Sequence, residues 1–148
     1  MRISKAYIEI TNRCNLNCTT CYNRSGLNTV TREIGVTELE RMITTFMSYG
    51  AKRILISGGE PTLPSEFEKI AALPSRYPQL SFGVTTNGTT AAARSVLAPA
   101  IKSQENMTLQ ISLDGSSEET NALTRGRGNF EKAVEFARSV SDSPAEKR

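Results

Sequence analysis

Three cysteines, Cys14, Cys18 and Cys21, lie within the segment CNLNCTTCYN and are the only cysteines of a chain that has no histidine. Thiolates and imidazoles are the usual soft ligands of zinc and of iron–sulfur clusters, and both kinds of site usually take four protein ligands. Three cysteines therefore leave one coordination position open. An open position is typical of a reactive metal site, whereas structural sites are closed.

The cysteine segment is predicted to be a loop, because its Cys-x3-Cys-x2-Cys spacing is too tight for three rigid elements. It follows residues 6–11, AYIEIT, whose alternating side chains predict a β-strand. Asn15, Asn17 and Thr19 keep the loop polar. We therefore expect a metal site at the carboxyl end of a strand.

Helix and strand patterns alternate along the rest of the chain. Further strands are predicted at 53–57, 80–85 and 107–113. Apolar residues at helical spacing follow a Thr37…Glu40 capping box and end at Gly50. The other predicted helices are 65–73, which Pro74 closes, 91–97, and 129–140.

Four βα units in sequence predict an α/β fold with parallel strands joined by right-handed crossovers. Ligands of such folds bind at the carboxyl ends of the strands. The segments GGEP (58–61), TTNG (85–88) and SLDG (112–115) each follow a predicted strand. We expect them to meet the cysteine loop on one face.

Together these segments resemble the radical S-adenosylmethionine (radical SAM) superfamily. The resemblance rests on CxxxCxxC followed by Tyr22, on GGEP, TTNG and SLDG, and on Arg125-Gly126, and it covers residues 5–140. It implies a 4Fe–4S cluster held by the three cysteines and SAM bound at the free iron. Reductive cleavage of SAM would then release a 5′-deoxyadenosyl radical, with a flavodoxin or ferredoxin as electron donor.

The resemblance also implies the residues that contact SAM. GGEP would meet the SAM amino group, Ser112 and Asp114 the ribose or the methionine end, and Arg125 the carboxylate. The full predicted set of cofactor-binding residues is Tyr22, Gly58, Gly59, Glu60, Pro61, Thr86, Asn87, Ser112, Asp114 and Arg125. No residue for proton transfer is assigned. Relatives often carry a histidine in the region where this chain has Asn121.

The chain is shorter than the family pattern, whose cores have six βα units in an open barrel. We predict a single domain over 1–148, a parallel (β/α)4 half of a partial (β/α)6 TIM-type barrel, with a polar tail at 141–148. The fourth strand would have an unpaired apolar edge, formed by Met107, Leu109, Ile111 and Leu113. Either the chain is a fragment, or a partner chain completes the barrel.

Composition narrows the class of protein. With 38% hydrophobic and 22% charged residues, the chain is predicted to be an ordinary globular domain. A net charge of +3 without a basic run argues against a nucleic-acid partner, and no apolar stretch is long enough for a membrane span. Reduced thiolates suit a reducing compartment, so a cytoplasmic location is expected.

Three functional alternatives stay open. SLDG with RGxG favours the branch of the family that modifies peptides or proteins. The tripeptide CYN is reminiscent of the short glycyl-radical activating enzymes. A non-catalytic iron–sulfur or other metal-binding module would also use three cysteines, with a carboxylate or a partner's residue as the fourth ligand.

Overall fold

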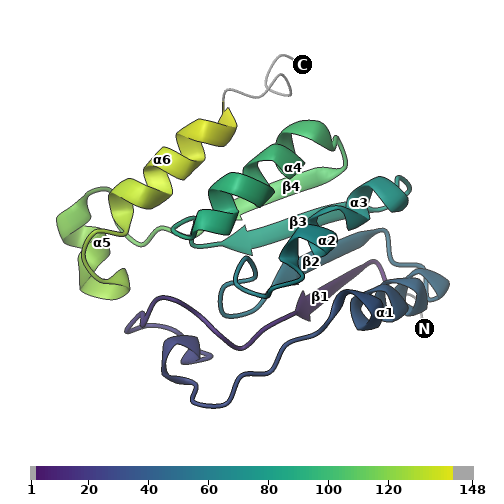
Figure 1. Ribbon diagram of the computed structural model, residues 1–148, viewed down its shortest axis with the longest axis horizontal. Coiled ribbons are helices and arrows are strands. Elements are labelled where there is room, and N and C mark those ends of the chain that lie inside the picture. Colours follow the sequence, from purple (N-terminus) through teal and green to yellow (C-terminus); the bar gives the residue numbers. More distant parts are fainter. Residues whose placement is uncertain (1–2, 142–148) are drawn as a thin grey trace.

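A computed structural model describes residues 3–141, which form one four-stranded parallel sheet (Figure 1). The strands are β1 (Lys5–Glu9), β2 (Arg53–Ser57), β3 (Ser81–Thr86) and β4 (Met107–Ile111), and they pair in the order of the sequence. The predicted parallel α/β fold is confirmed. β1 and β4 are the two edges of the sheet.

Within residues 3–141, eight helical segments connect and follow the strands. They are η1 (Ser25–Leu27, a 3-10 turn), α1 (Val36–Ser48), α2 (Phe67–Ala71), α3 (Leu73–Arg76), η2 (Ala93–Leu97, a π-helical turn), α4 (Ala98–Ser103), α5 (Glu118–Arg125) and α6 (Phe130–Ser141). In Figure 1, α2 and α4 lie in front of the strands and cover one face of the sheet, and α6 lies beside α4.

The covered face carries the core. Strand register aligns Ile8 with Ile56, Ile56 with Val84, and Val84 with Leu109, so one apolar row crosses the sheet. Successive side chains of a strand point to opposite faces, and the opposite row begins with Tyr7, which is 66% exposed. This difference in burial between the two faces is expected of half a barrel, because the inner face lacks the strands that would enclose it.

The predicted apolar edge of β4 is wrong for three of its four residues. Met107 is buried, and Leu109 and Ile111 pack against the core, so these side chains contribute to the hydrophobic core. Leu113, which lies beyond the end of β4, is 40% exposed. What β4 leaves unpaired within residues 3–141 is one side of its backbone, since β3 is its only strand partner there.

Two helix boundaries differ from the sequence expectation. The predicted capping box is wrong, because α1 begins at Val36, whose N–H donates to the Glu66 carboxylate at 3.1 Å. Pro74 does not close a helix either; it lies in the first turn of α3, where a missing N–H costs no helical hydrogen bond. Gly50, with φ at +96°, follows α1 as expected.

At the carboxyl end, β4 stops at Ile111, and α5 forms where no helix was predicted. A Ser117 capping box starts α5: the hydroxyl of Ser117 accepts the N–H of Thr120, and the Thr120 hydroxyl accepts the N–H of Ser117. The helix predicted at 129–140 is confirmed as α6. Apart from Ser141, the predicted polar tail lies outside the described residues. No helix within residues 3–141 is long and apolar enough to cross a membrane.

Candidate functional site

The cysteine loop begins directly on the GGEP turn. The N–H of Gly59 donates to the Thr11 carbonyl and that of Glu60 to the Arg13 carbonyl, both at 2.8 Å. A Cβ on Gly59 would lie 2.2 Å from the Arg13 oxygen, and one on Gly58 would lie 2.3 Å from the Thr11 oxygen. The two glycines therefore make room for the chain's own loop.

Two further contacts hold the loop in place. Asn15 donates to the Thr89 hydroxyl at 2.9 Å, which ties the loop to the segment after β3. The N–H of Thr19 donates to the Thr124 carbonyl at 2.9 Å, which ties it to α5. The loop thus rests on the turns that follow β2 and β3 and on the helix that follows β4.

A pocket of about 220 Å³ opens between the loop and the strand ends. Cys14, Cys18 and Cys21 all line it. Of the predicted SAM contacts, seven also line it, namely Tyr22, Gly58, Gly59, Thr86, Asn87, Ser112 and Arg125. Segments from four separate βα units therefore converge on one hollow, as parallel strand ends predict.

Glu60 and Pro61 do not line this pocket. The Glu60 side chain is fully buried, and its carboxylate accepts hydrogen bonds from the N–H and hydroxyl of Thr62, the Thr86 hydroxyl and the Asn87 N–H. Thr62 in turn contacts the Thr90 hydroxyl at 2.6 Å. Glu60 therefore joins the GGEP and TTNG turns from beneath the pocket.

Asp114 also lies outside the pocket lining, and its carboxylate pairs with Arg125. Arg125 Nε lies 2.9 Å from one carboxylate oxygen, and Nη2 donates to the other at 3.3 Å. Sequence analysis gave these two residues separate contacts with SAM. In the structure they contact each other at the mouth of the pocket.

Asn121 is a positioning residue that sequence reasoning did not assign. Its side chain is fully buried, and its Oδ1 accepts the N–H of Asp114 at 3.0 Å. It therefore fixes the turn after β4 that carries Asp114. Its position between SLDG and RG, where relatives often have a histidine, was the available signal.

The three thiols are free, and none is in a disulfide. Burial raises the pKa of Cys14 and of Cys18, while the positive charge of Arg125 opposes the rise for Cys18. Among residues 3–141, no group of three or more His, Cys, Asp or Glu side chains is close enough together to hold a metal ion. Three cysteine thiols that line one pocket are the donor chemistry of a thiolate-bound iron–sulfur cluster.

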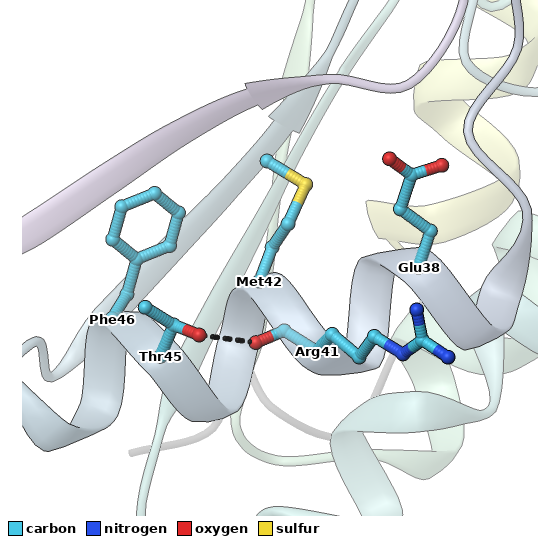
Figure 2. A pocket seen from close by; sticks show the side chains of 5 residues that line it. All are labelled: Glu38, Arg41, Met42, Thr45 and Phe46. Atoms are coloured by element: carbon cyan, nitrogen blue, oxygen red, sulfur yellow. Dashed lines mark hydrogen bonds between the residues drawn. The ribbon is translucent and has the colours of Figure 1, made fainter.

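Another hollow follows the surface of α1 (Figure 2). It is lined by Glu38, Arg41, Met42, Thr45 and Phe46, all from one helix. The Thr45 hydroxyl donates to the Arg41 carbonyl at 2.8 Å, so it is already satisfied. This hollow contains none of the predicted site residues.

A family profile of the radical SAM superfamily matches residues 8–144. The chain is 37% identical over 148 residues to a protein of Methanocella arvoryzae named "Probable GTP 3′,8-cyclase", covering 97% of this chain and 46% of that protein. It is 30% identical over 141 residues to the mycofactocin maturase MftC of Mycolicibacterium smegmatis, covering 91% of this chain and 33% of that protein. The chain thus spans less than half the length of these relatives.

Solved structures show the same fold. Streptococcus suis SuiB bound to S-adenosylmethionine matches with a TM-score of 0.83 at 16% identity, over 95% of this chain and 32% of SuiB. SuiB bound to its precursor peptide SuiA matches with the same TM-score of 0.83, at 18% identity, over 95% of this chain and 31% of SuiB. The likeness bears out the predicted part of a TIM-type barrel.

Proposed function

This chain belongs to the radical SAM superfamily, whose members use a 4Fe–4S cluster and SAM, and we propose that it carries the cluster on Cys14, Cys18 and Cys21. The observation that carries the proposal is the convergence of all three thiols with the ends of β2, β3 and β4 on one pocket. When bound, the cluster supplies the electron that cleaves the SAM sulfonium and releases a 5′-deoxyadenosyl radical.

The chain's own residues would orient SAM in that pocket. Gly58 and Gly59 line it, and a ligand's amino group would meet their backbone there. Ser112, held by its N–H to the Thr86 carbonyl at 2.9 Å, would offer a hydroxyl from the end of β4. Arg125 has the planar guanidinium that matches a carboxylate, and Asp114 would hold that guanidinium in place.

For the substrate, we propose a peptide or protein. The support is the SLDG and RGxG pattern together with the structural likeness to SuiB, which has been solved with its precursor peptide. A flavodoxin or ferredoxin would supply the electron. Further strands, from a longer form of this protein or from a partner chain, would pair with the free side of β4.

A purine nucleotide is the second candidate substrate. It is favoured by the 37% identity to the protein named "Probable GTP 3′,8-cyclase", which is higher than the 30% identity to MftC. The substrate would then be GTP or a related nucleotide bound on the bare inner face of the sheet.

Anaerobic reconstitution of the chain with iron and sulfide tests the proposal. We expect about four irons per chain, and 5′-deoxyadenosine on addition of SAM and dithionite. Cys18→Ala should lose both. A peptide pool and GTP, tested in parallel, should differ in how strongly they stimulate 5′-deoxyadenosine formation. Full cluster occupancy in Cys18→Ala would contradict the ligand assignment, and an intact cluster that never cleaves SAM would favour the metal-binding module.

A further inference from the structure

The fully buried side chain of Glu60 must be a carboxylate for a geometric reason. One oxygen accepts the backbone N–H of Thr62 at 3.2 Å, and the other accepts the backbone N–H of Asn87 at 2.8 Å. Hydroxyl groups can rotate to suit a new partner, but a backbone N–H cannot. A glutamine would face one of these two fixed donors with its own NH₂ group, whichever way its amide turned.

Glu60 thereby fixes the backbone of Asn87, and Thr89 fixes the Asn87 side chain. The N–H and the hydroxyl of Thr89 both donate to Asn87 Oδ1, at 2.9 and 2.8 Å. With its oxygen occupied in this way, the amide has one orientation that satisfies its partners. Nδ2 then faces the cysteine loop.

On that side, Asn87 Nδ2 has two acceptors. It donates to Asn15 Oδ1 at 2.9 Å and lies 3.9 Å from Cys14 Sγ, within reach of a weak N–H···S hydrogen bond. Sulfur is a large acceptor, so such contacts are longer than those to oxygen. The Cys14 sulfur also accepts the backbone N–H of Leu16 at 3.4 Å.

The surroundings of Cys18 are different. There burial raises the pKa of the thiol most, Arg125 lowers it, and Cys21 and Asp114 raise it. Cys14 thus has N–H donors held by a buried network that includes the charged Glu60, whereas Cys18 lies near a partly exposed ion pair. Hydrogen bonds to ligand sulfurs are one of the levers by which a protein sets the reduction potential of an iron–sulfur cluster.

We propose that Asn87 raises the reduction potential of the cluster by holding its amide N–H on Cys14 Sγ, and that Glu60 is the positioning residue that keeps Asn87 there. An N–H donor stabilises the more negative, reduced state of the cluster more than the oxidised state. The inference rests on the proposed function, since it needs a cluster on Cys14. It adds a role for two residues that the sequence analysis had assigned to SAM.

An EPR-monitored redox titration of the reconstituted chain without SAM tests this inference. Asn87→Leu keeps the approximate shape of the side chain but removes the N–H, so its midpoint potential should be more negative than that of the parent. Asn87→Asp places a carboxylate oxygen beside the sulfur and should shift it further in the same direction. Glu60→Gln removes a negative charge close to Cys14, which by itself would raise the midpoint potential. A more negative potential in this variant would therefore identify displacement of Asn87 as the larger effect, and a more positive potential would contradict the positioning role of Glu60.

Asn15→Ala is the matched control, since Asn15 contacts Asn87 but has no hydrogen bond to the sulfur in the described structure. Its midpoint potential should stay near that of the parent. If Asn87→Leu does not retain a cluster, Asn87→Ser, whose shorter hydroxyl cannot reach the sulfur, takes its place.

Three outcomes overturn the inference. An intact cluster with the parent's midpoint potential in the Asn87 variants shows that the N–H has no effect. An equal shift in Asn15→Ala assigns the effect to the loop as a whole. A parent chain that takes up no cluster overturns the proposed function, and the inference with it.

Discussion

The two sides of the pocket are built in opposite ways. On one side, Glu60 and Thr86 are at most 2% exposed, and their hydrogen bonds are made to other parts of the chain. On the other side, the paired side chains of Arg125 and Asp114 are 18% and 31% exposed. We infer from this difference that the buried residues fix the backbone of the GGEP and TTNG turns, and that the more exposed residues are the ones a ligand can contact.

The two sides differ because Glu60 is buried, whereas Arg125 and Asp114 are partly exposed to water. Hydrogen bonds to a buried carboxylate are not screened, and removing one partner leaves fixed donors without acceptors. An ion pair near water contributes little to folding, typically below about 1 kcal/mol, because solvent competes for both partners. The same exposure leaves Arg125, which lines the pocket, open to a bound molecule while Asp114 holds its guanidinium.

The largest expected effect is on the buried side. Glu60→Gln should lower the free energy of unfolding by about 3 kcal/mol, because one backbone N–H loses its acceptor in a dry site. For a domain of this size, that corresponds to a fall of about 6 to 12 °C in Tm. Arg125→Gln should change the free energy by less than about 1 kcal/mol. If denaturant titrations showed the same loss in free energy of unfolding for both variants, the two sides would not differ in their contribution to stability.

The next effect concerns the contact between the GGEP turn and the cysteine loop. Gly59→Ala should cost about 2 kcal/mol of stability, as overpacking does, because the new Cβ overlaps the Arg13 carbonyl. It should also reduce cluster occupancy, since the loop must move. Gly128→Ala is the control for iron content, because its Cβ meets nothing within 4 Å and its only cost is backbone strain at φ +75°, in a residue that is not part of the cysteine loop. Iron content equal in both variants would show that the loop tolerates the overlap.

On the exposed side, the effect should appear in binding rather than in folding. Asp114→Asn loosens Arg125, so the affinity of the reconstituted chain for SAM should fall about 10-fold, the loss expected for one charged hydrogen bond. The free energy of unfolding should change by less than about 1 kcal/mol. Calorimetric titration and thermal melts measure the two quantities. A variant that loses stability but keeps its SAM affinity would assign Asp114 a structural role instead.

The smallest expected effect is at Glu66, a partly exposed carboxylate that accepts the backbone N–H of Val36. Lys69 and the N–H of Val36 lower the pKa of Glu66. Its stabilising contribution is therefore present at neutral pH and is lost as the pH falls through this lowered pKa. Thermal melts should show Glu66→Gln melting slightly below the parent at pH 7, with the gap closing in acid. If the difference in Tm between the variant and the parent increased in acid, the lowered pKa of Glu66 would be contradicted.

Sequence reasoning was accurate where a signal is local. The alternation around Ile8 and the glycine at position 50 predicted β1 and the end of α1, because backbone preferences decide both. The meeting of the strand-end motifs also followed from topology alone, since parallel strands place their carboxyl ends together.

Long-range contacts were not predictable from one sequence. Glu60 was assigned to SAM by its motif, yet its side chain is buried against Thr86 and Asn87, which are distant in the sequence. Glu66 caps α1 from thirty residues away, where a local capping box was expected. In both cases the partner of a carboxylate was decided by packing, which a single sequence does not display.

The most direct test of the proposed cluster and SAM site is the EPR spectrum of the reduced, reconstituted chain with and without saturating SAM. SAM should change the signal of the cluster proposed on Cys14, Cys18 and Cys21, because SAM would bind at the position for which the three cysteines supply no ligand. The change should weaken in Asp114→Asn as the affinity falls. A cluster whose spectrum is indifferent to SAM would contradict the proposed SAM site and would make this chain a non-catalytic iron–sulfur module.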